Sequence, residues 1–206
     1  MVSYKGLPAP LICDYMSREE SRHLYDEGTE FRIAKIEMVG NTGTYLDCPF
    51  HRYEQGKDLS EMSIQQLTDL DGIVIRVDSQ VSRSIDVDCF KGKEIRGKAV
   101  LVNTGWDQFW NSDMYFENHP YLTEGAARYL IDCEVKLVGI DSMNMDDTTR
   151  KQRPVHSLLL AEEIPIVEHL CKLDQLPETG FTFTALPPKF KGTGTFPVRA
   201  MAKIEL

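Results

Sequence analysis

Two stretches decide the fold, Lys98-Ala-Val-Leu-Val-Asn103 and Val135-Lys-Leu-Val-Gly-Ile140. Both are largely apolar over their length instead of alternating apolar and polar residues. Runs of this kind and length are typical of strands that are covered on both faces. We therefore expect these two stretches to lie in the centre of a sheet with further layers packed against it.

Alternating segments predict further strands. Residues 31–38, 181–185 and 198–206 alternate apolar and polar side chains, as half-buried strands do. Residues 72–77 form a β-branched run directly after an Asp-Gly turn signal. Because the last alternating segment reaches the final residue, we expect the C-terminus to be held in the sheet.

Fewer segments predict helices. Ser63 and Gln66 match a capping box that opens a helix to about residue 70, and Thr123 caps a second helix through residue 132. A third covers residues 155–162 and ends before Pro165, and residues 164–170 suit a short strand or an extended turn. These elements predict a single mixed α/β domain, residues 1–206, around a curved sheet.

Composition narrows the class of partner. The chain has 206 residues and a formal net charge of −9, without a basic cluster, which disfavours nucleic acid and anionic membranes. No run of eighteen apolar residues predicts a membrane span, and the first residues show no secretion signal. The five cysteines are scattered without a Cys-x-x-Cys pair, which indicates reduced thiols in a cytoplasmic protein.

The stretch Asn41-Thr-Gly-Thr-Tyr45-Leu-Asp47-Cys-Pro-Phe-His51 carries most of the chemistry. Its amide, phenol, carboxylate and imidazole occupy positions of the same parity. If the segment is extended, these four side chains leave on one face, while Cys48 leaves on the other. Such a dense polar face predicts one wall of a functional site.

A metal site would need further ligands from other elements, placed opposite that wall. His156, at the start of an amphipathic segment, and Glu168 are the candidates, whereas His23 and His119 are expected on the surface. Spacing alone leaves a buried structural histidine as the competing interpretation. The glycine-rich residues 192–196 lack the context of a phosphate loop and are interpreted as a loop or lid.

These residues resemble the signature of the cyclase-like metal-dependent hydrolases, His-x-Gly-Thr-His-x-Asp-x-Pro-x-His, a family that includes bacterial kynurenine formamidase. Gly43-Thr44, Asp47, Pro49 and His51 match it. Two downstream blocks also match, Val155-His156-Ser-Leu158-Leu159 and Ile166-Val-Glu168-His-Leu170. The similarity continues through residues 98–106 and 138–141.

The resemblance implies a swivelling β/β/α fold with a curved mixed sheet or barrel, and a dimer or higher oligomer. It also implies one or two zinc or manganese ions. In such enzymes the first two signature histidines and the aspartate are ligands of one position, and the aspartate, the downstream histidine and the glutamate are ligands of the second. This chain departs from the family pattern, because Asn41 and Tyr45 stand where the first two histidines are expected. Asp47, His156 and Glu168 remain, and the resemblance implies that they hold a single ion.

The favoured hypothesis is hydrolysis of an amide or cyclic amide of a small-molecule substrate. Water activated by the metal would attack the carbonyl, His51 would shuttle the proton, and Tyr45 would hydrogen-bond the oxyanion. The residues expected to contact the substrate are Asn41, Arg52, Trp106 and Arg153.

Two other hypotheses stay open. The chain could be a metal-free family member that binds a small molecule, because two ligands of the family set are missing. Alternatively, Cys48 could be a nucleophile with His51 as its base. The strand parity argues against the second, because it places these two side chains on opposite faces.

Overall fold

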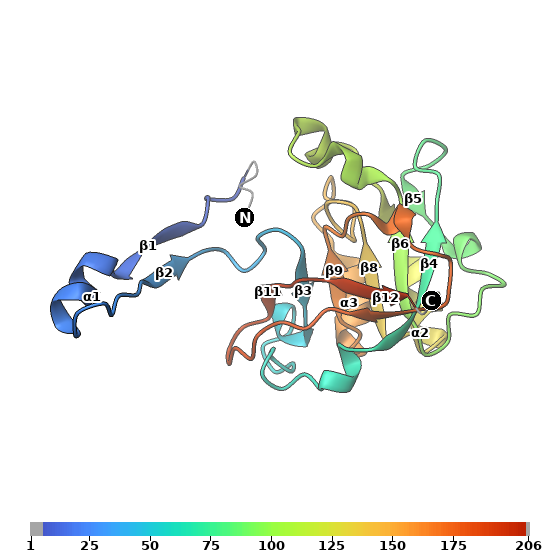
Figure 1. Cartoon of the computed structure of the whole chain (residues 1–206). Coiled ribbons are helices and arrows are strands. Elements are labelled where there is room, and N and C mark those ends of the chain that lie inside the picture. Colours follow the sequence, from blue (N-terminus) through green and yellow to red (C-terminus); the bar gives the residue numbers. More distant parts are fainter. Residues whose placement is uncertain (1–5, 205–206) are drawn as a thin grey trace.

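The computed structural model describes residues 6–204, and its main element within that range is an eight-stranded curled sheet (Figure 1). The strands, in spatial order, are β11 (Thr195–Pro197), β3 (Tyr45–Asp47), β9 (Ile166–Glu168), β8 (Leu137–Ile140), β6 (Ala99–Asn103), β4 (Leu70–Arg76), β10 (Phe181–Thr184) and β12 (Met201–Ile204). The four central strands, β9 to β4, run parallel, and the outer pairs are antiparallel. The mixed α/β class and the curved sheet expected from the sequence are confirmed.

The central strands are buried on both faces, as their apolar runs predicted. Val100 and Val102 point into one core, together with the helices, while Leu101 points into the other. A residue in a strand alternates faces with its neighbour, so a strand between two cores needs apolar residues at every position. This explains why neither run alternates in the sequence.

Helices α2 (Glu124–Asp132) and α3 (Pro154–Ala161) cover one face of the sheet. The Thr123 hydroxyl accepts from the Ala126 N–H and caps α2 as expected. Pro154 occupies the first turn of α3, where its missing N–H costs nothing. Short 3₁₀ turns and a small parallel pair complete this part of the chain: η1 (Pro49–His51), η2 (Ile64–Gln66), η3 (Val87–Cys89), η4 (Trp106–Phe109), η5 (Asp113–Phe116), η6 (Leu173–Gln175), β5 (Ser84–Ile85) and β7 (Tyr121–Leu122).

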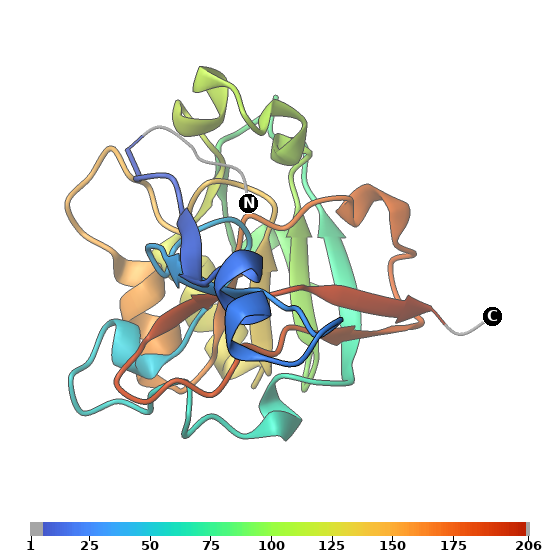
Figure 2. The ribbon, with the colours of Figure 1, turned by 60° about the vertical axis from the view of Figure 1, so that its left-hand side comes forward.

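An N-terminal arm projects away from the sheet. It consists of β1 (Leu11–Met16), α1 (Arg18–Leu24) and β2 (Ile33–Glu37), with β1 and β2 paired antiparallel (Figures 1 and 2). Its large apolar side chains are exposed to solvent; they are Leu11, Ile12, Tyr15, Leu24, Tyr25, Ile33 and Ile36. The arm therefore leaves an apolar surface uncovered in one copy of the chain.

One helical expectation was wrong, and one helix was missed. Residues 64–66 form a single 3₁₀ turn, and the Ser63 hydroxyl contacts the Gln65 side chain instead of capping a helix. Helix α1 was missed, although Ser17 and Glu20 form a complete capping box. The expected C-terminal strand is present as β12, but residues 205–206 lie outside the described residues. Among residues 6–204, no helix is long and apolar enough to cross a membrane.

Candidate metal centre

Strand β3 and the turn after it form the first wall of the site. Tyr45 and Asp47 share one face of β3, but the chain then leaves the extended conformation and enters the 3₁₀ turn at Pro49. The condition of one extended segment through His51 is therefore not met. The turn brings His51 back towards Asp47, so that its Nδ1 lies 3.4 Å from Asp47 Oδ1.

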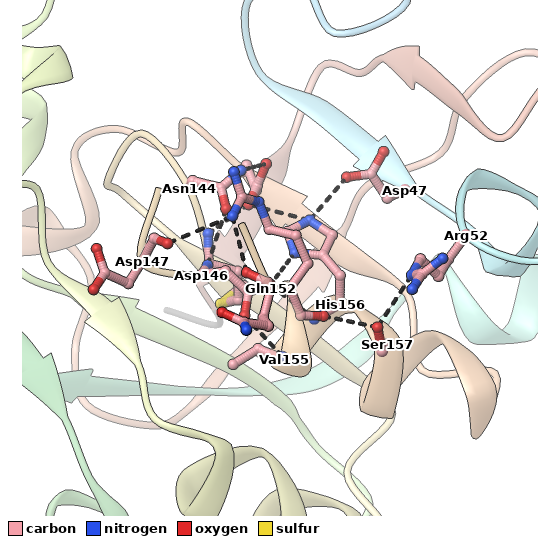
Figure 3. Close-up of polar contacts among 12 residues, drawn as sticks. Asp47, Arg52, Asn144, Asp146, Asp147, Gln152, Val155, His156 and Ser157 are labelled. Atoms are coloured by element: carbon pink, nitrogen blue, oxygen red, sulfur yellow. Dashed lines mark hydrogen bonds and ion pairs between the residues drawn. The ribbon is translucent and has the colours of Figure 1, made fainter. Parts of the chain in front are cut away.

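Helix α3 supplies His156, and Asp146 fixes its orientation (Figure 3). The Asp146 carboxylate accepts from the backbone N–H groups of Val155, at 2.8 Å, and of His156, at 3.0 Å. It also lies 2.6 Å from His156 Nδ1. Because the carboxylate accepts the proton on Nδ1, Nε2 is left to face the sheet, 3.7 Å from Asp47 Oδ2 and 3.5 Å from Glu168 Oε1.

Glu168 enters from β9, directly opposite Tyr45 in the register of β3 and β9. Its Oε1 accepts from the Met145 N–H at 2.5 Å, and its Oε2 accepts from the Tyr45 hydroxyl at 2.5 Å. Asn144 Nδ2 lies 3.4 Å from Oε2. Burial raises the pKa of Glu168, which His156 partly offsets, to about 7.

The donor set fits one divalent cation. Asp47 Oδ2 is buried and has no hydrogen-bond partner within the described part of the chain, although buried carboxylate oxygens normally have one. Burial lowers the pKa of His156, but Glu168, Asp146 and Asp47 outweigh it and raise that pKa to about 10. Two carboxylates converging on one imidazole thus form a cluster suited to a cation, and Asp47, His156 and Glu168 are the residues that could hold it.

A second ion has no comparable ligands at Asn41 and Tyr45. Burial raises the pKa of Tyr45 well above its ordinary value, and the charges of Glu168 and Asp47 raise it further. The phenol therefore stays protonated and donates to Glu168, while Asn41 interacts with the same phenol. The expected oxyanion role of Tyr45 is not supported, because its one proton is already given to Glu168.

A cavity of about 620 Å³ opens over His51 and His156. Its walls are formed by His51, Arg52, Asn144, Lys151, Gln152, Arg153, Pro154, His156 and Ser157. Arg52 reaches Ser157 Oγ at 3.1 Å, whereas Arg153 donates to the backbone carbonyls of Arg150 and Gln152 and so holds its own loop. The cavity thus offers a small molecule a positively charged rim above the carboxylate cluster.

Comparison with known proteins places this geometry in a family. The Cyclase family profile matches residues 7–147. The chain belongs to the cyclase family. Kynurenine formamidase of Geobacillus thermodenitrificans is 30% identical over 84% of this chain and 81% of its own length. That of Erythrobacter litoralis is 31% identical over 80% of this chain and 73% of its own length.

Solved structures show the same cyclase fold. A potential metal-dependent hydrolase with cyclase activity superposes with a TM-score of 0.76 and 25% identity, over 97% of this chain and 92% of that chain. Isatin hydrolase A from Labrenzia aggregata gives a TM-score of 0.80 at 21% identity, over 98% and 85% of the two chains. The second likeness concerns the fold alone.

Trp106, which was expected to contact the substrate, is placed elsewhere in this cyclase-family member. Trp106 does not line the cavity; it is buried, and its indole N–H donates to the Tyr115 carbonyl at 3.0 Å. Trp110 and Tyr115 instead border a separate cavity of about 220 Å³, together with His169. Burial lowers the pKa of His169 to about 3, so this imidazole is neutral.

Three further outcomes concern single residues. His119 was expected on the surface but is buried, with Nε2 2.9 Å from Thr148 Oγ1. Burial raises the pKa of the Cys48 thiol to about 11, which argues against a nucleophilic cysteine. Asp146 was missed in the sequence; it lies nine residues before Val155, too far along the chain to be read as an ordinary N-cap of α3, whose N-cap residue is Arg153.

Proposed function

We propose that the chain is a metal-dependent hydrolase that cleaves the C–N bond of an amide or cyclic amide. The observation that carries this proposal is His156, which Asp146 holds with Nε2 towards Asp47 and Glu168 beneath the cavity. Membership of the cyclase family and relatives that are kynurenine formamidases support the reaction class. One catalytic domain spanning the whole chain accounts for these residues.

The division of labour follows from the contacts. Asp47, His156 and Glu168 would hold the ion, which when bound would supply Lewis acidity for a scissile carbonyl and acidify water. His51 lies at the cavity with about a third of its side chain exposed, where it can take a proton from water and return it to the leaving nitrogen. Proton transfer of this kind contributes roughly 10²–10⁴-fold. Tyr45 supports Glu168 through its hydrogen bond.

The chemistry of the ligands favours one ion, manganese or zinc. Two of the three ligands are carboxylates, and oxygen-rich sets lean towards manganese, whereas zinc tolerates the same set. The neutral Asn41 and Tyr45 side chains explain why we propose a single ion instead of two.

The rim of the cavity favours a small-molecule substrate that carries negative charge next to its amide. Arg52 and Lys151 both border the cavity. Among the described hydrogen bonds, the Arg52 guanidinium donates only to the neutral hydroxyl of Ser157. Arginine and lysine pair with carboxylates at such positions. Arg153 contributes charge but is held by backbone carbonyls, and Asn41 contacts Tyr45 instead of the cavity.

The N-terminal arm favours a homodimer. An isolated two-stranded ribbon is marginally stable in water, and large apolar patches on a monomer mark interaction sites. Tyr15 and Leu24 are 73% and 67% exposed on this arm. We propose that the arm packs against a second copy of the chain. The cytoplasmic location expected from the unpaired cysteines stays a prediction.

Metal loading and amide hydrolysis test the function together. The chain, stripped with chelator and reloaded with Mn²⁺ or Zn²⁺, is assayed with isatin and with an N-formylated aromatic amine. We expect about one ion per chain and hydrolysis that depends on it, and both should be lost in His156→Ala.

The matched control is His119→Ala, which removes a buried histidine whose described hydrogen bonds go to Pro120 and Thr148 and not to the carboxylate cluster. It should retain metal binding if it folds. A chain that binds neither ion under any loading condition would overturn the hydrolase and leave the metal-free binding protein as the better account.

A further inference from the structure

The glycine-rich segment at residues 192–196 is built into the site and is not a lid. Its second half forms β11, which pairs antiparallel with β3 and places Thr195 directly opposite Asp47. The segment is held from both sides, because Cys48 N–H donates to the Gly194 carbonyl at 2.9 Å and Leu59 N–H donates to the Thr193 carbonyl at 3.0 Å. A segment with these backbone bonds cannot swing away without opening the sheet.

Gly194 permits this close approach. A Cβ at this position would overlap the backbone nitrogen and Cα of His51, closer than real Cβ atoms come to such atoms. Without a side chain at Gly194, the segment lies directly on the turn that carries His51. Thr195, the next residue, then places its side chain between Asp47 and His51.

The Thr195 hydroxyl bridges Asp47 and His51. It hydrogen-bonds Asp47 Oδ1, and its oxygen lies 2.7 Å from His51 Nδ1. Thr195 is buried, so water does not compete freely for these bonds. A hydroxyl carries one proton, and an ionised carboxylate only accepts.

The direction of both bonds follows. The Thr195 proton goes to Asp47, and the Thr195 oxygen must therefore accept a proton from His51 Nδ1. A neutral His51 with its proton on Nδ1 has Nε2 as its basic nitrogen. The hydrogen bond from Thr195 occupies Oδ1 of Asp47. The other carboxylate oxygen, Oδ2, has no hydrogen-bond partner among the described residues and faces His156 Nε2.

We propose that Thr195 is a positioning residue that sets the Nδ1–H tautomer of His51 and turns Oδ2 of Asp47 towards the metal. This inference deepens the proposed function, since it assigns the group that orients both the proton carrier and a ligand. The hydroxyl belongs to residues 192–196, which their glycine content alone had suggested to be a loop.

The test compares Thr195→Val with Thr195→Ser. Valine has a similar shape but no hydroxyl, whereas serine retains the hydroxyl. Nitrogen-15 NMR of the metal-free protein reports the His51 tautomer, with His51→Gln used to assign the signals. Calorimetric titration with Mn²⁺ measures affinity. We expect the valine variant to lose the predominance of the Nδ1–H form and to bind Mn²⁺ about 10–100-fold more weakly, and the serine variant to keep both properties.

Unchanged tautomer and affinity in a folded Thr195→Val protein would overturn the inference. If the valine variant does not fold, the wild-type spectrum decides by itself, because a predominant Nε2–H form contradicts the assigned bond direction. Failure of the proposed function is distinguishable: it would show as absence of Mn²⁺ binding in the wild type, while the tautomer in the metal-free protein still tests the role of Thr195.

Discussion

Replacing Asp146 with asparagine should weaken metal binding although Asp146 is not a ligand. The carboxylate accepts three hydrogen bonds, from the N–H groups of Val155 and His156 and from His156 Nδ1. Asparagine offers one oxygen and one NH₂ group. If the NH₂ faces His156, the imidazole must accept at Nδ1 and carry its proton on Nε2, where it blocks the metal. If it faces Val155, two donors meet at the start of α3.

The magnitude follows from either arrangement. Loss of a carboxylate that orients a metal-binding histidine costs about 10–100-fold in affinity, or about 1.4–2.8 kcal/mol at 1.4 kcal/mol per tenfold change. A buried donor left without an acceptor lowers the free energy of unfolding by about 1–3 kcal/mol. Metal affinity is measured by titration with Mn²⁺, and stability is measured by urea unfolding in chelator.

Asp147→Asn is the matched control. The neighbouring Asp147 bonds Thr149 and pairs with Arg83, and no described hydrogen bond joins it to His156. Its variant should bind Mn²⁺ as the wild type does. An Asp146→Asn protein with wild-type Mn²⁺ affinity would refute the orienting role of Asp146.

Four other outcomes are expected. The double variant Asn41→His with Tyr45→His restores two imidazoles of the family signature, so zinc stoichiometry by atomic absorption should rise from one to two; it would stay at one if the pocket cannot hold a second ion. Gly194→Ala should lower the free energy of unfolding by at least about 1–3 kcal/mol in urea, because its Cβ meets backbone that cannot move aside; wild-type stability would contradict this. Burial lowers the pKa of His119 below its ordinary value of 6.5. As the pH falls, this histidine therefore takes up a proton in the unfolded chain before it does so in the folded chain, and folding stability that is present above about pH 6.5 is lost on acidification. The urea midpoint should thus fall less between pH 7.5 and 5.5 in His119→Gln than in the wild type, and equal slopes would exclude this role. Tyr15→Lys should shift sedimentation from dimer to monomer without loss of the fold, whereas an unchanged dimer would show that this side chain lies outside the interface.

The sheet could largely be predicted from the sequence because its signals are local. A strand between two cores must be apolar at every position, and this requirement is visible in residues 98–103 without knowledge of their partners. Thr123 likewise predicted the start of α2, and Pro165 predicted that α3 ends before it, through the chemistry of helix ends. The capping motif at Ser63 misled, because tertiary packing holds the segment in a single turn and overrides a weak local preference.

The site could be predicted only in part. The candidates Asp47, His156 and Glu168 came from residue type together with the resemblance to the cyclase-like hydrolases, and the structure brings them together. The contacts of Asp146 and Thr195 were not predictable, because hydrogen bonds between residues distant in the chain depend on register and burial. The role of Tyr45 changed for the same reason, since its partner across β3 and β9 is Glu168.

The sequence by itself determined a mixed sheet covered on both faces and the side chains available for the candidate metal centre. Only the tertiary structure decided how those side chains are used. The turn at Pro49 returns His51 to Asp47, and the seating of Gly194 places a hydroxyl between them. Local patterns fix backbone periodicity, whereas the direction of a buried hydrogen bond depends on which donors and acceptors folding brings within reach.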